Sequence, residues 1–553
     1  MNYNTLSFWG LFLVVLIPYW RLSHKWQNRF LLVASYVFYG AWDYRFLTLV
    51  LIATAIDYVG GLGVAGIRLS RRHLCMIAGW IVGGVTLLCS HIQYAQLAES
   101  IWQGNLAGAW NALPHTLADW YLPLGALIGC AAYIVLVHEL YRLSDAKRRK
   151  WFVAVSMVAN LTMLGFFKYW DFFIANLDGL LTQLGFGGLG GSALGIILPA
   201  GISFYTFQAM SYTIDIYRGE AKPTKSFPDF ALFVCFFPHL VAGPIMRAST
   251  LLPQVVRPRT ARPAAFEEGL LLILFGLFKK MVIADNMAPI VNSVFLRYLD
   301  STTGTLTGAD VLVAVYAFAF QIYGDFSGYS SIARGISKWL GFELIVNFWT
   351  PYLAVSPRDF WQRWHISLSS WLRDYLYIPL GGNRYGTLYT YRNLMLTMFL
   401  GGLWHGANWT FVVWGLYHGA LLCAFRGLGI RDPVCGGSLR QRAYWLLRVL
   451  LMFHLTCFGW LLFRADNFTM CAAMMQSLAT DFVWTSHTTW MLGMVLFYCA
   501  IPFAIEWLLD GENKIEQLVQ AHWSLSGMTC AYLSVMLLFF HASNTYEFIY
   551  FQF

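Results

Sequence analysis

Charged side chains are scarce in this sequence. Asp, Glu, Lys and Arg together make up only 12% of its 553 residues, whereas a soluble domain has about a quarter. Hydrophobic residues reach 58% and aromatic residues 18%. This composition excludes an ordinary soluble enzyme and indicates a single polytopic membrane domain.

The motifs of several enzyme classes are also missing. The sequence has no GxSxG nucleophile elbow, no HExxH zinc motif and no GxxxxGK[ST] phosphate-binding loop. These absences exclude a serine hydrolase of the common type, a zinc enzyme of the HExxH class and a P-loop ATPase.

Paired cysteines are missing as well. The ten cysteines occur singly, with no CxxC pair, and most stand in apolar runs. Free cysteines in such runs are commonly small buried hydrophobes, so we predict neither a disulfide nor a metal site. Their positions are Cys75, Cys89, Cys130, Cys235, Cys423, Cys435, Cys457, Cys471, Cys499 and Cys530.

The net charge of +9 does not indicate a nucleic-acid partner. Lys and Arg cluster in short loops between apolar runs, and no basic stripe is interleaved with aromatic residues. Such loops lie on the cytoplasmic side of membrane proteins. The first apolar segment, LSFWGLFLVVLIPYW, has Arg21, Lys25 and Arg29 after it and no basic residue before it. This order is the reverse of a signal peptide, and it predicts a retained helix with its N-terminus outside.

Apolar runs of the kind that cross a bilayer recur along the chain. When every short basic loop is placed on the cytoplasmic side, the path is consistent and both termini lie outside. We therefore predict an all-α polytopic membrane protein with about eleven to twelve transmembrane helices. The predicted spans are 7–20, 30–41, 46–66, 74–90, 119–141, 151–174, 194–216, 267–290, 310–333, 444–463, 488–508 and 524–541.

Two apolar segments, 230–246 and 393–425, have basic loops at both ends. A segment that starts and ends on one side of the membrane is not a single span. Irregular backbone at membrane depth is tolerated only where it is buried in protein or lines a cavity. We predict a short re-entrant segment at 230–246 and a broken, inward-dipping hairpin at 393–425, with His405 near its deepest point.

A long and mostly basic stretch, 334–392, precedes this hairpin. Within it, DFWQRWHISLSSWLRDYLYIPL mixes aromatic and charged residues at helical spacing. It is too polar to cross lipid alone, so we predict an amphipathic helix that lies at the cytoplasmic interface or is tucked into the protein. His365 stands in this helix among serines, arginines and an aspartate. It belongs either to a solvated polar face or to a functional site.

His405 has a different setting. An ionisable side chain at membrane depth usually faces the protein interior and is a functional candidate. His405 follows Trp404 within the glycine-rich run FLGGLWHGANWTFVVWG, and Asn408 would share its face if the helix continued. A neutral imidazole there suits the removal of a proton from a hydroxyl away from bulk water. His239 and His418 are instead predicted to be structural histidines with buried hydrogen bonds.

A transporter is a competing interpretation. Ionisable residues in or beside apolar runs, together with two broken segments, are also typical of transporters. The two halves of the chain show no repeat of pattern, however, which favours a reaction site. The residues concerned are Asp215, Lys279, Lys280, Asp285 and Asp325.

These segments resemble a known family. GLWHGANWTFVVWGLYHG, DFWQRWHISLSSWLRDYLYIPLGGNR and YGDFSGYSSIARG are similar to motifs of the membrane-bound O-acyltransferase family, in particular its bacterial branch that acetylates polysaccharides such as alginate. LPAGISFYTFQAMSYTIDIYRG, FFPHLVAGPIMR and the closing FIYFQF extend the resemblance over most of residues 165–425 and the C-terminus. The chain departs from the usual pattern at Ser331, Arg334 and Trp349, which leaves the polymer and the partner open.

The resemblance implies re-entrant helices around a thin central region with a catalytic tunnel. It divides the chain into N-terminal helices (1–165), a catalytic core (166–425) and C-terminal helices (426–553). It implies that His405 is the catalytic base, and that His365 orients the thioester or helps to stabilise the oxyanion. The other residues expected to bind substrate or line the tunnel are Trp404, Asn408, Asp325, Ser369, Arg363, Arg373 and Asp374.

The resemblance also implies an enzyme of the bacterial inner (cytoplasmic) membrane with both termini in the periplasm. No bound cofactor is expected. Acetyl-CoA is the expected donor, and the basic stretch 334–392 would attract its phosphates. The acceptor is a hydroxyl of a polysaccharide, or of a periplasmic polysaccharide-acetylation protein that relays the acetyl group. D-alanyl or other acyl transfer from a carrier-protein thioester, a transporter for a small acylated species and a non-catalytic scaffold for a polymer synthase stay open as alternatives.

Overall fold

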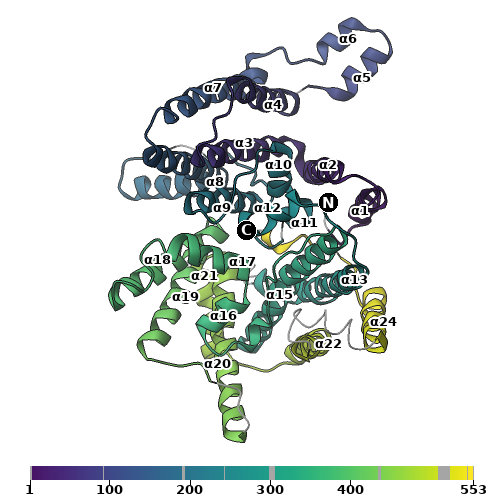
Figure 1. Ribbon diagram of the computed structural model, residues 1–553. Coiled ribbons are helices and arrows are strands. Elements are labelled where there is room, and N and C mark those ends of the chain that lie inside the picture. Colours follow the sequence, from purple (N-terminus) through teal and green to yellow (C-terminus); the bar gives the residue numbers. More distant parts are fainter. Residues whose placement is uncertain are drawn as a thin grey trace.

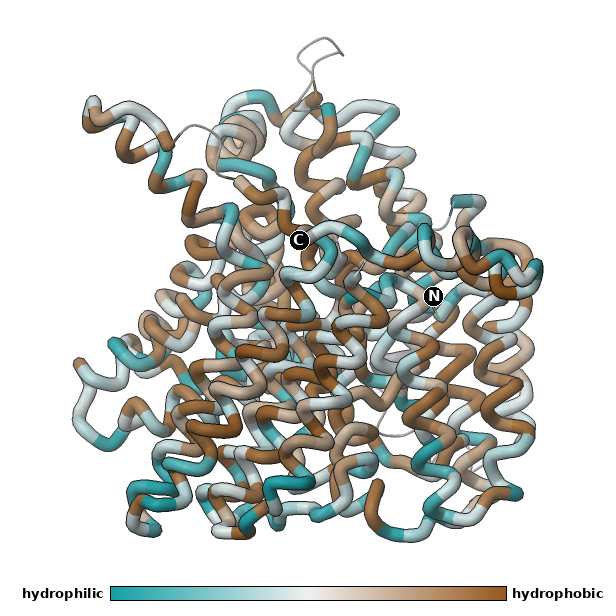
Figure 2. Tube along the Cα trace, turned by 90° about the horizontal axis from the view of Figure 1, so that it is seen from above, coloured by the Kyte–Doolittle hydropathy of each residue, from teal (hydrophilic) through white to brown (hydrophobic). Residues whose placement is uncertain are grey.

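The structure is a computed structural model, and it describes residues 3–90, 92–189, 193–241, 243–297, 306–433, 438–508, 523–544 and 546–551. Every regular element in these ranges is a helix (Figure 1). Hydrophobic residues fill the middle of the helices, and hydrophilic residues gather in the turns along one end (Figure 2).

Six helical segments of the described ranges are long and apolar enough to cross a membrane, and three shorter helices are also apolar. They confirm the predicted class, an all-α polytopic membrane protein. The number of eleven to twelve spans and the division into three parts stay predictions. The six are His24–Val64, Arg71–Cys89, Ala118–Leu140, Asp145–Gln183, Gly308–Trp339 and Leu439–Arg464.

The N-terminal region contains a short turn near residue 43, between the predicted spans 30–41 and 46–66. There the backbone of Asp43 is extended, and its carboxylate accepts the N–H of Arg45 at 2.9 Å, which separates the second helix from the third. The elements are α1 (Leu6–Tyr19), α2 (His24–Asp43), η1 (Tyr44–Phe46), α3 (Leu47–Val64), α4 (Arg71–Cys89), α5 (Tyr94–Trp102), α6 (Leu106–Asn111), α7 (Leu117–Leu140), α8 (Asp145–Gln183) and α9 (Ile202–Arg218).

The middle of the chain forms the centre of the molecule. Its elements are α10 (Phe227–Cys235), α11 (Phe237–Leu240), α12 (Ala248–Val256), α13 (Pro263–Phe278), the π-helical turn η2 (Lys279–Ala284), α14 (Asp285–Phe295), α15 (Gly308–Trp339), η3 (Pro351–Leu353), α16 (Pro357–Arg363), α17 (Ile366–Leu372), the π-helical turn η4 (Arg373–Tyr377), α18 (Thr387–His405) and α19 (Trp409–Gly427). Helices α10 and α11 have nine and four residues and are almost wholly buried, so segment 230–246 is not a single span, as predicted.

The C-terminal region returns to the centre of the molecule. Its elements are α20 (Leu439–Arg464), α21 (Phe468–Thr480), α22 (Ser486–Leu508), α24 (Trp523–Phe539) and η6 (Ile549–Phe551). Figure 1 shows both ends of the chain near the middle of the view, with the yellow C-terminal segment close to α11 and α15. The last described residues are therefore in position to take part in a central site.

The central helices α13 and α15 pack closely because glycines face the partner backbone. A Cβ atom on Gly276 would lie 2.6 Å from the carbonyl oxygen of Gly328, and one on Gly328 would lie 2.8 Å from that of Gly276. Small residues allow this close approach of helices in membranes. The contact brings Lys280, which follows α13, beside Asp325 of α15.

The prediction of one amphipathic helix over DFWQRWHISLSSWLRDYLYIPL is wrong. The segment forms α16 and α17 and then η4, with a break at His365, whose φ is 44°. The N–H of Ile366 bonds to the carbonyl oxygen of Asn347, and the N–H of Trp349 bonds to that of Arg363, each at 2.9 Å. These bonds to the neighbouring loop replace helical ones, so a local period of 3.6 residues did not reveal the break.

The prediction of a broken hairpin over 393–425 is confirmed. Helix α18 ends at His405, and α19 runs back beside it. A Cβ on Gly402 would lie 2.3 Å from the carbonyl oxygen of Phe411, and one on Gly415 would lie 2.3 Å from that of Met398. The two arms pack backbone to backbone, and this packing fixes His405 at the turn.

The nine cysteines within the described residues are free. Four of them are buried, as expected of small hydrophobes: Cys235, Cys457, Cys471 and Cys499. Cys75 is exposed, so the prediction of burial is wrong for this residue. Cys435 lies outside the described residues.

Candidate active site

His405 lies where two cavities meet. One cavity, of about 930 Å³, extends past α17 and α19 to the basic loop after α19. The other, of about 490 Å³, extends to the start of α9 and to the C-terminal segment. His405 lines both, although only 4% of its surface is exposed. The imidazole thus borders both cavities and is otherwise enclosed by the protein.

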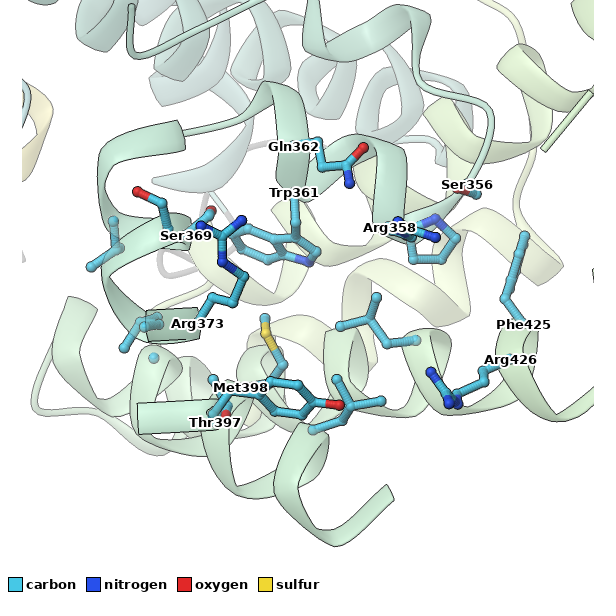
Figure 3. Close-up of a pocket in the computed structure, with 18 of the residues that line it drawn as sticks. Ser356, Arg358, Trp361, Gln362, Ser369, Arg373, Thr397, Met398, Phe425 and Arg426 are labelled. Carbon is cyan, nitrogen blue, oxygen red and sulfur yellow. The ribbon is translucent and has the colours of Figure 1, made fainter. Parts of the chain in front are cut away.

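The first cavity is apolar inside and basic at its mouth. Arginines outnumber its single aspartate, Asp432, by four to one. The four are Arg358, Arg373, Arg426 and Arg431. Figure 3 shows Arg358, Arg373 and Arg426 around the cavity, with the ring of Trp361 between them. The indole Nε1 of Trp361 is buried and has no hydrogen-bond partner in the described part of the chain, so it could donate to a bound molecule. The mouth suits an anionic ligand with an apolar or amide-bearing arm.

Tyr550 contacts His405 from the second cavity. Its hydroxyl oxygen lies 3.2 Å from Nδ1 of the imidazole. When the ring proton is on Nδ1, the Nδ1–H group donates a hydrogen bond to the tyrosine oxygen, and Nε2 has a free lone pair. Within the described residues Nε2 has no protein partner. This arrangement is that of a general base with one nitrogen held and the other free. Tyr550 belongs to the closing motif FIYFQF, but no role was predicted for it from the sequence.

Lys168 of α8 supports the end of α18 that carries His405. Its ammonium group donates to the carbonyl oxygens of Trp404, at 2.6 Å, and of His405, at 2.9 Å. The last carbonyl groups of a helix lack partners within the helix and attract a positive charge. Lys168 also lines the second cavity. Lys168 was not predicted as a site residue, although a single lysine in the apolar run GFFKYWDFF is the same kind of signal that identified His405.

His365 is fully buried and lines neither cavity among the described residues. Its Nδ1 lies 3.2 Å from the side-chain oxygen of Asn347. Its ring centroid is 6.1 Å from that of Trp404, which in turn is 5.1 Å from that of His405. The two histidines are therefore linked by one tryptophan ring, and His365 packs behind the site.

Three of the other predicted site residues line the cavities. Ser369 and Arg373 line the first cavity, and Trp404 lines the second. Asp374 lies beside the first cavity and pairs with Arg373, at 2.6 Å, and with Arg247, at 2.5 Å. Burial acts to raise the pKa of the Asp374 carboxyl, but hydrogen bonds from these two guanidinium groups outweigh burial and lower that pKa. Asp374 is therefore a fixed negative charge that holds Arg373 at the mouth.

The remaining predicted residues lie elsewhere. Asn408 caps α19, accepts the N–H of Thr410 at 3.1 Å and donates to the carbonyl oxygen of Asp466. The expectation that it shares a helix face with His405 is wrong, because α18 ends at His405. Arg363 pairs with Asp359 within α16 at 2.7 Å. Asp325 is buried in an ion-pair cluster with Lys280 and Asp285.

The two histidines predicted to be structural are buried in the protein. Nε2 of His239 lies 2.7 Å from the side-chain oxygen of Gln208, which confirms a buried hydrogen bond for this residue. His418 is 1% exposed, and its ring stacks on Phe360 with the centroids 5.9 Å apart. Neither residue lines the two cavities that meet at His405, as far as the described residues show.

Comparison with known proteins shows which sequences this chain is similar to. Residues 218–445 match the membrane-bound O-acyltransferase family. The chain is 36% identical to the probable alginate O-acetylase AlgI of Azotobacter vinelandii, over 88% of this chain and 79% of that protein. It is 33% identical to the peptidoglycan O-acetyltransferase of Helicobacter pylori, over 78% of this chain and 88% of that protein. It is 27% identical to the teichoic acid D-alanyltransferase of Bacillus subtilis, over 48% of this chain and 69% of that protein.

Proposed function

The chain belongs to the membrane-bound O-acyltransferase family, and we propose that it moves an acetyl group from acetyl-CoA in the first cavity to a hydroxyl in the second, for the O-acetylation of a polysaccharide. One observation carries the proposal: a single imidazole lines both cavities. Donor and acceptor approaching from opposite sides would therefore meet at one base.

The first cavity suits a coenzyme A thioester. Its volume of about 930 Å³ lies within the usual range for cofactor sites, roughly 300–1,000 Å³. The arginines at its mouth would hold the phosphates, and the apolar interior would take the pantetheine arm. The positive-inside rule places this mouth in the cytoplasm, where acetyl-CoA is made. The protein then lies in the inner membrane with both termini in the periplasm.

The reaction is an acyl transfer with His405 as general base. Nε2 takes the proton of the acceptor hydroxyl as its oxygen attacks the thioester carbonyl carbon. The carbon–sulfur bond of the resulting tetrahedral adduct breaks. The thiolate then takes the proton from the imidazolium, so that an ester and free coenzyme A leave and the imidazole returns to its neutral form. No metal or redox partner is needed for the balance of this step.

The acceptor is inferred from the relatives. Two of them are named for O-acetylation of alginate and of peptidoglycan, which are polymers outside the cytoplasmic membrane. The second cavity would admit either a sugar hydroxyl of such a polymer or the hydroxyl of a periplasmic polysaccharide-acetylation protein. We propose this wider acceptor class, with alginate as one member.

The test uses the purified protein in detergent with radiolabelled acetyl-CoA and a polysaccharide acceptor, with and without periplasmic partner proteins. We expect ester formation by the unchanged protein and none by His405→Ala, with equal amounts of both proteins in the membrane. Unchanged ester yield from His405→Ala would remove the catalytic role of His405. Absence of transfer from any thioester would overturn the proposed function.

Three alternatives are separated by related measurements. Similarity to a teichoic acid D-alanyltransferase supports D-alanyl transfer from a carrier protein, which a preference for D-alanyl-carrier thioester over acetyl-CoA would reveal. Two cavities that meet at one residue also fit a transporter. Ester formation by the purified protein would exclude transport as its sole function. A non-catalytic scaffold would tolerate His405→Ala but not truncation of its loops.

A further inference from the structure

A further cavity, the arginine cavity, lies beside the mouth of the first. Its volume is about 630 Å³, and none of its lining residues lines either cavity at His405. Three arginines and two acidic residues are part of its lining, which therefore carries a net positive charge. These five residues are Arg218, Glu220, Arg247, Asp374 and Arg384.

The ring of Tyr375 and the chain at Asp374 hold two of these arginines in place. Cζ of Arg218 lies 5.0 Å from the centroid of the Tyr375 ring, and Cζ of Arg247 lies 5.4 Å from it. Arg247 pairs with the Asp374 carboxylate at 2.5 Å, and Arg218 donates to the Asp374 carbonyl oxygen at 3.0 Å. A guanidinium group has five N–H donors, so both arginines keep donors for a ligand. Planar donors that are fixed before binding match the oxygens of a phosphate group.

Arg384 adds a positive charge that no protein group neutralises in the described part of the chain. Its side chain has no hydrogen bond or ion pair there. Asp374 is already shared between Arg247 and Arg373, the latter at the mouth of the first cavity. Glu220 is exposed and opposes an anion in part. The balance of charge still favours an anionic ligand.

The loop that carries Arg384 is fixed to α18. The side-chain nitrogen of Asn393 donates to the carbonyl oxygen of Gly382 at 2.9 Å, and Arg392 donates to that of Leu380 at 3.4 Å. The cavity is therefore preformed, and its lining combines arginines with apolar loop residues. The loop residues that line it besides Arg384 are Ile378, Pro379, Leu380, Gly381 and Tyr385.

An exposed apolar face leads away from the arginine cavity along α18. Tyr385 lines the cavity, and Leu388, Tyr389 and Leu396 follow it at helical spacing. All four side chains are exposed. Figure 1 shows α18 at the edge of the molecule, so this face is open to the surrounding lipid. A ligand that fits both features carries a phosphate group and hydrocarbon chains.

We propose that the arginine cavity binds the head group of an anionic phospholipid, whose acyl chains lie along the exposed face of α18. The positive-inside rule places these arginines at the cytoplasmic surface. Anionic lipids give that surface a negative potential, and basic pockets between membrane helices bind their head groups. The proposal goes beyond the proposed acyl transfer and does not depend on it.

The test measures lipid binding to the delipidated full chain in detergent by native mass spectrometry. The protein is titrated with phosphatidylglycerol, which is anionic, and with phosphatidylcholine, which has no net charge. We expect the apparent Kd of the first bound lipid to be at least about fivefold lower for phosphatidylglycerol. Equal values for the two lipids would overturn the proposal.

Arg384→Gln shows whether the arginine cavity is the site. It removes one charge and leaves no protein partner unpaired among the described residues. We expect the Kd for phosphatidylglycerol to rise about fivefold and the Kd for phosphatidylcholine to stay unchanged. The net charge of +9 attracts anionic lipids in general, so a control is needed.

Arg440→Gln is the matched control. Arg440 is an exposed arginine in the first turn of α20 and does not line the arginine cavity. We expect its replacement to change the Kd for phosphatidylglycerol less than about twofold. Equal rises in this variant and in Arg384→Gln would show attraction by net charge alone and would overturn the site.

Glu220→Gln tests the same cavity in the opposite direction. It removes the acidic side chain that opposes an anion, and we expect the Kd for phosphatidylglycerol to fall about twofold to fivefold. An unchanged or higher Kd would contradict the proposed position of the head group.

Inorganic phosphate, added at constant ionic strength, separates a lipid from a soluble ligand. We expect it to leave bound phosphatidylglycerol in place, because the acyl chains contribute to lipid binding. Binding of phosphate that depends on Arg384, without any preference for phosphatidylglycerol over phosphatidylcholine, would assign the cavity to a soluble phosphate and overturn the lipid.

Transfer kinetics separate this cavity from the donor site. We expect Arg384→Gln to keep KM for acetyl-CoA within about twofold of wild type in detergent. A rise in that KM as large as the rise in lipid Kd would assign the cavity to the donor and overturn the proposal. Absence of acyl transfer by the unchanged protein would overturn the proposed function and leave the lipid measurement standing.

Discussion

The hydroxyl oxygen of Tyr550 lies 3.2 Å from Nδ1 of His405, although 145 positions separate the two residues in the sequence. The contact joins the last described segment of the chain to the turn of the α18–α19 hairpin. His405 is thereby held on one nitrogen by a side chain and at its backbone carbonyl by Lys168. Supports of this kind would hold His405 in a fixed geometry for the proposed role of general base.

Tyr550→Phe removes the hydroxyl and keeps the ring. A neutral hydrogen bond contributes about 1 kcal/mol, and about 1.4 kcal/mol corresponds to a tenfold change in rate. We therefore expect kcat for acetyl transfer to fall roughly tenfold, with an unchanged midpoint of thermal unfolding. Steady-state kinetics of the purified protein check this. Wild-type kcat in Tyr550→Phe would show that the hydroxyl does not orient the base.

Lys168→Met should lower activity more than its small volume change suggests. It removes two charge-assisted hydrogen bonds to carbonyl oxygens at the end of α18, each contributing about 1.5–3 kcal/mol. It also removes a positive charge that interacts favourably with the negative end of the helix dipole. We expect kcat to fall on the order of a hundredfold.

Lys150→Met is the matched control for this variant. Lys150 is exposed near the start of the same helix, α8. Among the described residues no hydrogen bond or ion pair joins Lys150 to α18, so the control should keep wild-type kinetics. Equal losses in the two variants would point to a general effect of charge on insertion and would contradict the specific role of Lys168.

Arg426 and Arg431 at the mouth of the first cavity should act on the donor. We expect the double variant Arg426→Gln/Arg431→Gln to raise KM for acetyl-CoA about tenfold at low salt and less at high salt, because ionic screening weakens exposed charge pairs. A short acetyl thioester without phosphate groups should show the same KM with both proteins. The exposed Arg440, replaced in the same way, is the control. An equal rise in KM for both thioesters would argue against phosphate binding at this mouth.

Gly415→Ala should destabilise the hairpin. Its added Cβ would lie 2.3 Å from the carbonyl oxygen of Met398, and overpacking of this kind costs about 1–3 kcal/mol. We expect a lower midpoint of thermal unfolding in detergent. Gly79→Ala is the control, because no atom lies within 4 Å of a Cβ there, and alanine favours a helix over glycine. Equal midpoints would show that α18 and α19 can separate without loss.

Local patterns predicted the parts of this fold that depend on local physics. Basic loops at both ends of an apolar run were sufficient to predict that 230–246 and 393–425 are interrupted segments. A segment that starts and ends on one side of the membrane is not a single span, and its irregular backbone must be buried in protein or line a cavity. The break at His365 was not predictable in this way. It depends on bonds to Asn347, 18 positions away, and the helical spacing of the aromatic residues continues across it.

In the candidate site, too, only the residues with a local signal in the sequence could be predicted. His405 was identified because an ionisable group in an apolar run is costly wherever the chain folds. Lys168 satisfied the same criterion and was overlooked. Tyr550 could not be assigned a role, because a tyrosine near the end of a chain carries no local sign of its neighbour in space. The pairing of Asp325 with Lys280 likewise depends on glycine contacts between two helices.

His365 lines neither cavity among the described residues. Its backbone conformation and its contact with Asn347 nevertheless restrict the substitutions that it can tolerate. Its φ of 44° lies in the left-handed region, which asparagine and histidine tolerate better than alanine does. Its Nδ1 faces the side-chain oxygen of Asn347. His365→Asn keeps the backbone preference and can donate its amide N–H to that oxygen, whereas His365→Ala loses both and leaves a cavity behind Trp404.

We therefore expect His365→Asn to keep activity within about tenfold of wild type and His365→Ala to lose about a hundredfold. The thermal midpoint should fall mainly in the alanine variant, since cavity and strain terms act on the folded state. If His365 instead contacts the thioester directly, the two variants would lose the same activity at equal thermal midpoints, and kinetics measured beside thermal unfolding separate these outcomes.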